Sequence, residues 1–300
     1  MSTPSSPNIL VLQETTGAAQ QYGRAYIFQF YPESPNQLFI IATSHRDSLT
    51  CANGPTTPKV QAEVYKIGEW LIRNRGLRLL LPEGFFREGP QRTVRETNRQ
   101  DPWVTGKKSP ELLDMKALER RLSDNKIYVN AEMLLKDNYP LYLAQIEDRN
   151  LYFAVSEGIR KLVNGNNPPR EYLPLKSELD YLQDRRTAAI LQKVPEIVQN
   201  EFDRGVIHEK KAFLTIGMNH IPSIVKYLEE KKIKIYCPSS VPVRGEDFIS
   251  DLNLIKEDFG VSILLPRTLV KDREILRISG LDKVMMESRY SLVPSLAPLP

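Results

Sequence analysis

Short apolar runs, of the kind found in buried strands, alternate along this sequence with longer segments of helical periodicity. The runs are "LFIIATS", "LRLLLP", "PLYLAQI" and "AFLTIGM", which begin at residues 38, 77, 140 and 212. The longest helical segment runs from Lys176 to Asp203. Because parallel strands need a long crossover connection, usually a helix, this alternation predicts an α/β fold with a largely parallel central sheet and flanking helices.

The pattern also suggests how the chain is organised. Residues 1–10 are polar and rich in Pro and Ser, so we expect a flexible N-terminus. Residues 11–238 hold the whole alternating pattern and are expected to form one α/β domain, beginning with a β-hairpin over residues 24–45. Residues 87–126 are charged and irregular, and are expected to be a long surface loop or lid. Residues 239–300 are expected to be an appended segment or subdomain.

Composition narrows the classes of partner. The net charge is only +4, and Lys and Arg are scattered among acidic residues, so we expect no nucleic-acid partner. No apolar run approaches the roughly 20 residues that span a bilayer, and the N-terminus does not resemble a secretory signal. Cys51 and Cys237 fit no metal or redox spacing. We expect a cytoplasmic protein with a small-molecule or peptide substrate and no membrane partner, and the oligomeric state stays open.

The four apolar runs end in side chains that carry chemistry. "LFIIATS" is followed by His45, "LRLLLP" by Glu83, "PLYLAQI" by Glu147 and Asp148, and "AFLTIGM" by Asn219 and then His220, in a chain that has only three histidines. Ligands of open α/β sheets bind outside the carboxyl ends of the strands. If these strands are parallel, the polar side chains converge at one edge of the sheet.

Histidine and carboxylate together suit zinc, manganese or iron with an open position for water. The predicted ligands of such a divalent metal are His45, His220 and Glu83. Each residue also has a structural alternative. Either histidine could be a hydrogen-bonded structural residue, Glu83 could cap a turn, and Glu147 and Asp148 could cap the helix that follows.

The long helix contributes an arginine to its apolar face. Arg186 lies seven residues after Leu179 and therefore falls on the apolar stripe. The stripe consists of Leu175, Leu179, Leu182, Ala189, Ile190, Val194 and Ile197. An arginine among buried positions needs a carboxylate or an anion, unless its stem packs while its head reaches water. At the edge of the sheet, Arg186 could stabilise an oxyanion or hold a catalytic carboxylate.

These motifs resemble the superfamily that includes TraB and GumN proteins, the TIKI proteases, the erythromycin esterases and the ChaN haem-binding proteins. Its members carry two G-x-x-H motifs, each closing a strand. The second is intact here at Gly217–His220, whereas Ala42–His45 has alanine in place of the first glycine. "LLPEGF" is similar to the family's strand-borne glutamate, at Glu83, and "RTAAILQKV" matches its helix arginine, at Arg186. The resemblance spans residues 25–238.

The resemblance implies an α/β core of two similar halves, each supplying one histidine motif. It also implies a hydrolase of a peptide, amide or ester bond, which we expect to be metal-dependent. One branch of the superfamily binds haem, so the alternatives are a non-catalytic binder of haem or of another metal ligand, and a degenerate scaffold. The substrate and the identity of the metal stay open.

The resemblance also suggests roles for individual residues. His45 and His220 would bind the metal, or act as base and orienting group without one. Glu83 would be the general base or the third metal ligand, and Arg186 would stabilise the oxyanion. The expected substrate-binding residues are Glu147, Asp148, Asn219 and Gly217. Glu147 and Asp148 lie in a stretch similar to esterase-like members, and Gly217 would allow a close approach of substrate or metal.

Overall fold

A six-stranded sheet forms the centre of the computed structural model, which describes residues 28–45, 52–86, 112–124, 129–164, 168–239 and 246–283. The strand order is β1-β8-β2-β5-β3-β4. The strands are β1 (Phe28–Phe30), β2 (Asn36–Thr43), β3 (Leu79–Pro82), β4 (Tyr142–Leu143), β5 (Lys211–Gly217) and β8 (Phe259–Leu264). All of them are parallel except β1, which pairs antiparallel with β8 at one edge. The predicted α/β fold with a largely parallel sheet is therefore confirmed.

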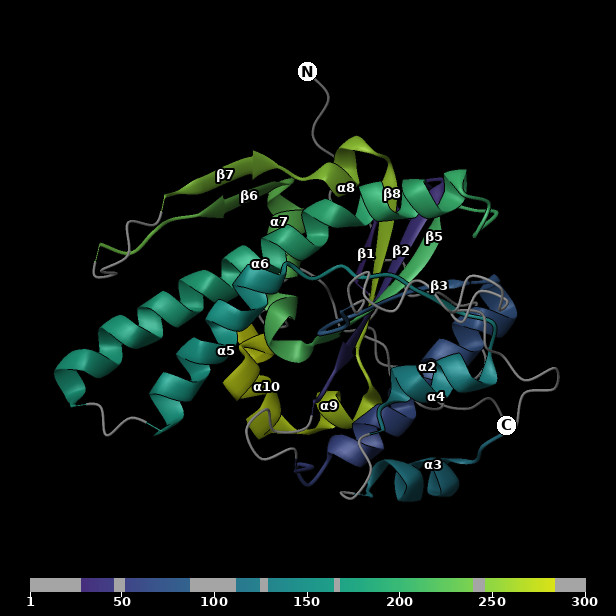
Figure 1. Ribbon diagram of the computed structural model, residues 1–300, viewed down its shortest axis with the longest axis horizontal. Coiled ribbons are helices and arrows are strands. Elements are labelled where there is room, and N and C mark those ends of the chain that lie inside the picture. Colours follow the sequence, from purple (N-terminus) through teal and green to yellow (C-terminus); the bar gives the residue numbers. More distant parts are fainter. Residues whose placement is uncertain are drawn as a thin grey trace, which may run out of the picture.

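Helices cover both faces of this sheet. They are α2 (Thr57–Arg75), α3 (Met115–Leu122), α4 (Ala131–Asn138), α5 (Arg149–Asn164), α6 (Pro169–Asp203), α7 (Ile221–Glu230), α8 (Asn253–Lys256), α9 (Arg267–Lys271) and α10 (Arg273–Ser279). A 3-10 turn, η2 (Met218–His220), leads from β5 into α7. A separate two-stranded antiparallel sheet joins β6 (Lys232–Ile235) to β7 (Phe248–Asp251). In Figure 1, α2 and α4 lie on one side of the central sheet, and α6 and α7 lie on the other.

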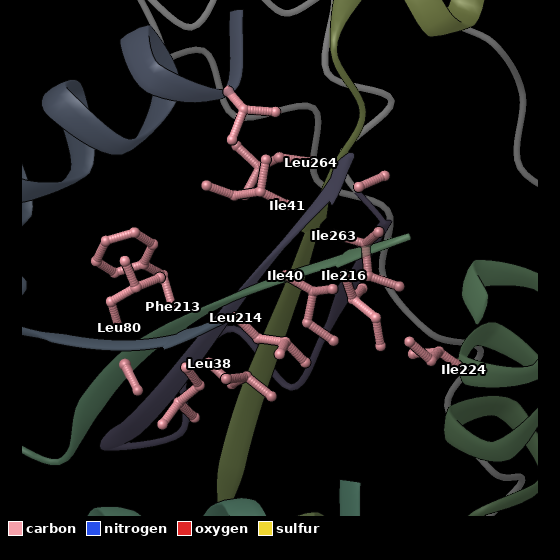
Figure 2. Packing of buried hydrophobic residues seen from close by; sticks show 14 of the residues in the cluster. Leu38, Ile40, Ile41, Leu80, Phe213, Leu214, Ile216, Ile224, Ile263 and Leu264 are labelled. Atoms are coloured by element: carbon pink, nitrogen blue, oxygen red, sulfur yellow. The ribbon is translucent and has the colours of Figure 1, made fainter. Parts of the chain in front are cut away.

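The core explains why the strands are apolar without interruption. Figure 2 shows Ile40, Ile216 and Ile263 pointing to the side where Ile224 of α7 lies, while Ile41 points to the opposite side. These residues are fully buried. Strands that are covered by helices on both faces need apolar side chains at every position, and this produces continuous apolar runs rather than alternation.

The register of the central strands brings their carboxyl ends together. β2 pairs with β5 from Gln37 opposite Lys211 to Thr43 opposite Gly217. On the other side of β5, Pro82 of β3 lies opposite Thr215. The residues that follow β2, β3 and β5 therefore start from one edge of the sheet.

The expected hairpin over residues 24–45 is wrong. β1 does not pair with β2, because β8 lies between them and pairs with both. The chain turns after β1, where Ser34 N donates to Tyr31 O, and then enters β2, which lies two strand positions from β1 in the sheet. Two apolar strands close in sequence suggested direct pairing, but a distant strand occupies that place.

Residues 239–300 were expected to be an appended segment, and their described part is instead integral to the fold. All six residues of β8 are buried, and the strand occupies an interior position of the central sheet. The expected boundary after residue 238 also separates β6 from β7, which pair with each other. A strand from the C-terminal part thus completes the same core.

The expected loop over residues 87–126 is wrong for its described part. Residues 115–122 form α3, which packs against α2 and buries Leu118 and Leu122. Asp114 caps this helix by accepting a hydrogen bond from Ala117 N at 2.7 Å. Residues 87–111, and the N-terminal residues 1–10, lie outside the described residues. Over the ranges that the structure describes, no helix has the length and apolar character needed to cross a membrane.

The ends of α2 follow known sequence signals, and α6 contains the helix predicted from the sequence. α2 starts with a proline in its first turn and stops at Gly76, whose φ of 67° is left-handed and favours glycine. α6 includes the predicted helix and begins earlier, at Pro169. Its length carries Arg186 to the carboxyl edge of the sheet.

Candidate functional site

Glu83 stands at the centre of the polar residues that gather at this edge. It follows β3 directly, and its backbone N–H donates to Thr215 O at 3.0 Å, which ties the end of β3 to β5. The next residue, Gly84, has a φ of +73°, a conformation that favours glycine. This turn leaves the carboxylate of Glu83 almost fully buried, with a side chain that is 10% exposed.

Nitrogen atoms of four residues surround the two carboxylate oxygens of Glu83. Oε2 lies 3.0 Å from Nε2 of His45 and also accepts a hydrogen bond from Gly217 N. Oε1 accepts from Nη2 of Arg186 at 2.7 Å and lies 3.3 Å from Nε2 of His220. Burial alone would raise the pKa of Glu83, but the charges and hydrogen bonds of His220 and His45 hold it well below its ordinary value. Glu83 is therefore ionised.

His45 is the accessible member of the group. It lies two residues beyond β2, and its side chain is 40% exposed, compared with 5% for His220. Removal from water lowers the pKa of His45, but the charge and the hydrogen bond of Glu83 outweigh this effect, and the net result is a raised pKa. His45 is thus a stronger base than an ordinary histidine.

Arg186 links Glu83 to a second buried carboxylate. Its Nε donates to Oε2 of Glu147 at 3.0 Å, and its Nη2 donates to Oε1 of the same residue as well as to Glu83. Oε1 of Glu147 also accepts from Gly84 N at 3.1 Å. Burial would lower the pKa of Arg186, but the hydrogen bond to Glu147 and the charge of Glu83 raise it. The arginine on the apolar stripe of α6 thus has carboxylate partners.

His220 is held from both sides of its ring. Nδ1 lies 2.6 Å from Oγ1 of Thr187, the residue after Arg186 on α6, and Nε2 faces Glu83. The Thr187 hydroxyl donates its only hydrogen to Gln183 O at 2.8 Å. It therefore accepts from Nδ1–H of His220, which fixes the proton on that nitrogen. His220 is a buried positioning residue behind Glu83.

Gly217 provides space rather than a turn. Its φ of −55° is available to any residue. A Cβ at this position would lie 3.2 Å from Oε2 of Glu83 and 3.5 Å from Cδ2 of His45. The glycine therefore lets β5 approach the His45–Glu83 pair closely, and its N–H donates to the carboxylate.

Two of the expected substrate-binding residues lie outside this group. Asp148 caps α5, because its Oδ1 accepts from Asn150 N at 3.0 Å and from Leu151 N at 3.1 Å. These backbone hydrogen bonds, led by that of Leu151, lower the pKa of Asp148. Asn219 is exposed, one residue before the buried His220. For Asp148, the structure shows the helix-capping alternative.

The motifs in the sequence did not point to two residues that shape the site. Gln61 of α2 is buried; its Nε2 donates to Thr43 Oγ1 at 2.9 Å and to Ser44 O at 2.8 Å, while its Oε1 accepts from Ala131 N at 2.8 Å. It thereby fixes the backbone that leads to His45. Tyr152 of α5 lies with its ring centroid 5.0 Å from Cζ of Arg186. Both belong to ordinary helical segments whose partners are set by the tertiary fold.

The arrangement does not fit the expected divalent metal. Oε2 of Glu83 is already engaged by His45 and Gly217 N–H, Oε1 accepts from Arg186, and the guanidinium of Arg186 adds positive charge where a cation would bind. Both ring nitrogens of His220 face protein partners. In the described ranges, no group of three or more His, Cys, Asp or Glu side chains is arranged to hold a metal ion.

Fold and site together define an α/β protein with a buried network of Arg186, Glu83, Glu147 and His220 at the carboxyl edge of a parallel sheet. His45 is the one member of the site that solvent reaches readily. Comparisons with protein-family models, with curated proteins and with solved structures find no match. The superfamily resemblance and its two similar halves therefore stay predictions based on the sequence motifs.

Proposed function

We propose that this site hydrolyses a carboxylic ester or amide bond, with His45 as the general base that activates water. The observation that carries the proposal is the 3.0 Å hydrogen bond between the accessible His45 and the buried Glu83. In the neutral ring, Nε2–H donates to the carboxylate, and Nδ1 then offers its lone pair to a water molecule. The raised pKa of His45 strengthens this base.

Glu83 acts through His45 in this proposal. Its oxygens are engaged by three donors, on His45, Gly217 and Arg186, so it is poorly placed to take a proton from water itself. A fixed, ionised carboxylate orients the imidazole and stabilises the imidazolium that forms when His45 accepts the proton. The imidazolium can then return that proton to the leaving group. This assignment differs from the expected role of Glu83 as base or metal ligand.

Arg186 supports the proposal as a donor to the developing oxyanion. Its hydrogen bonds to Glu83 and Glu147 use Nε and Nη2. None of these hydrogen bonds between described residues uses Nη1, so Nη1 would be the nitrogen that donates to a substrate oxygen, with the guanidinium held in place by two carboxylates. A preorganised charged donor of this kind stabilises a tetrahedral intermediate more than water does.

The test is hydrolysis of 4-nitrophenyl esters and a 4-nitroanilide, with and without a chelator, across the pH range in which histidine titrates. We expect His45→Ala to lower kcat/KM about 10²- to 10⁴-fold, the usual contribution of general acid–base catalysis. His208→Ala is the matched control, because His208 is exposed and makes no contact with the network. Failure of the wild type to cleave any of these bonds would contradict the proposal. So would activity that is lost to the chelator and restored by zinc.

A further inference from the structure

Three aromatic rings lie together beside the Glu83–Arg186 pair. Phe86 follows the turn that carries Glu83, and Tyr152 and Phe153 are neighbours on α5. The ring centroids of Phe86 and Tyr152 are 5.0 Å apart at an interplanar angle of 76°, and those of Phe86 and Phe153 are 6.2 Å apart at 6°. Tyr152 and Phe153 are 5.7 Å apart at 80°. These are the edge-to-face and stacked geometries that aromatic rings prefer.

This aromatic cluster (Phe86, Tyr152 and Phe153) borders the site directly. The Tyr152 ring lies over the guanidinium of Arg186, at 5.0 Å. A Cβ on Gly84 would lie 3.6 Å from Cε2 of Tyr152, so the ring is packed against the turn that holds Glu83. A substrate whose carbonyl reaches Arg186 therefore has these rings within reach.

The cluster is not explained by core packing. Phe153 is 58% exposed, and none of the three rings belongs to the hydrophobic core or to the partly buried residues packed against it. Phe86 and Tyr152 are half-buried. A partly exposed group of aromatic side chains next to a polar site is typical of a surface that binds a ligand. Its rings can stack on a planar group at little conformational cost.

An arginine adds a charge preference to this surface. Arg149, the first residue of α5, is exposed, and its Cζ lies 5.5 Å from the centroid of Phe86. Among the described residues, no carboxylate forms an ion pair with it. A guanidinium above an aromatic surface favours a ligand that combines a planar ring with a negative group.

We propose that the aromatic cluster binds an aromatic group of the substrate and that Arg149 pairs with a carboxylate on that group. The substrate would then be an ester or amide that carries an anionic aromatic part. The reaction rests on the proposed function, whereas binding of the aromatic anion does not. The two can therefore fail separately.

Binding is tested with phenylacetate, which has a ring and a carboxylate but no bond to cleave, and with cyclohexylacetate, which has the same charge without the aromatic ring. Chemical-shift titration of the full-length chain measures both affinities. We expect phenylacetate to bind more tightly. Phe153→Ala should weaken phenylacetate binding about 2- to 13-fold, the range measured for aromatic pairs, and leave cyclohexylacetate unchanged. Phe153→Trp should retain the preference.

Control variants separate the contribution of the aromatic cluster from that of any exposed aromatic side chain. Tyr236→Ala removes another exposed aromatic residue, 63% exposed and next to β6, and should change nothing. Arg149→Gln should weaken binding of phenylacetate and leave benzyl alcohol unaffected. Equal affinity for phenylacetate and cyclohexylacetate in the wild type, or unchanged phenylacetate binding in Phe153→Ala, would overturn the proposal. Intact phenylacetate binding in a protein that cleaves no ester or amide would instead contradict only the proposed function.

Discussion

Replacing Arg186 by methionine tests whether the buried network depends on this one cation. The side chains of Arg186, Glu83 and Glu147 are 6%, 10% and 0% exposed, so water cannot replace the arginine. Glu83 would keep its contacts with both histidines and Gly217. The carboxylate of Glu147 would lose both hydrogen bonds from Arg186 and keep the one from Gly84 N–H. The variant therefore leaves a fully buried carboxylate with its charge uncompensated.

The magnitude follows from this geometry. Removing one partner of a buried ion pair typically costs about 3–5 kcal/mol of unfolding free energy. For a chain of 300 residues, an unfolding entropy of about 2.1 cal/mol/K per residue gives about 0.6 kcal/mol per degree. The melting temperature should therefore fall by roughly 5–8 °C. The cost should shrink at acidic pH, because an unpaired buried carboxylate takes up a proton.

Urea unfolding and thermal unfolding, each followed by circular dichroism at neutral and acidic pH, measure the loss of free energy and the fall in melting temperature. Arg185→Met is the matched control: it removes a neighbouring arginine of α6 that packs on Tyr181 and Phe248, and it should cost about 1 kcal/mol or less. Adding Glu147→Gln to Arg186→Met should recover part of the loss, because it removes the orphaned charge. A loss of unfolding free energy in Arg186→Met no larger than that in Arg185→Met would refute this dependence on Arg186. A further loss on adding Glu147→Gln would refute it as well.

Further substitutions probe single contacts. Gly217→Ala places a Cβ 3.2 Å from Oε2 of Glu83, so hydrolysis should fall by about tenfold through displacement of His45, with little change in melting temperature; an unaltered rate would argue against close packing. The pKa of Glu83 is lower in the folded protein than in the unfolded chain. Its contribution to stability is therefore present above pH 4.5, the ordinary pKa of glutamate, and is lost as the pH falls through the pKa of the folded state. The stability deficit of Glu83→Gln in urea should therefore shrink on acidification; a constant deficit would contradict this. Thr187→Val should lower the free energy of unfolding by about 1–3 kcal/mol, because it leaves Nδ1 of His220 without a partner. Thr187→Ser keeps the hydroxyl and should retain most of that stability in the same assay. Equal losses in both variants would show that the hydroxyl is not responsible.

The convergence of the site could be predicted because each contributing strand carries its own signal. The apolar runs before His45, Glu83 and His220 mark buried strands, and parallel strands bring their carboxyl ends to one edge. The structure places both histidine side chains within hydrogen-bond or ion-pair distance of Glu83. Arg186 was predicted separately, because a charge on an apolar helical stripe requires a partner.

The order of the sheet could not be predicted in the same way. β8 pairs with β2 across more than two hundred residues of sequence, and nothing near either strand encodes that choice. Local proximity favoured a hairpin between β1 and β2, but the long-range pairing displaced it. The role of residues 239–300 was missed for the same reason.

The fit of a metal could not be judged from residue types alone. Two histidines and a glutamate are equally suited to hold a cation or to form a hydrogen-bonded network. What decides between them is the set of donors around Glu83, which includes a backbone N–H from Gly217 and the guanidinium of Arg186. Those contacts depend on the packing of β5 and α6, and so appear only in the folded protein.

The central claim, that Glu83 makes His45 a stronger base, is tested most directly by the pH dependence of kcat/KM for a 4-nitrophenyl ester in the wild type and in Glu83→Gln. The neutral form of His45 is the base, so the rate should rise with pH, with a midpoint above 6.5, the ordinary value for histidine. In Glu83→Gln the larger of the two charges that raise the pKa of His45 is gone while burial still lowers that pKa, so the midpoint should move to lower pH and the plateau should fall. An identical midpoint in both proteins would contradict the account.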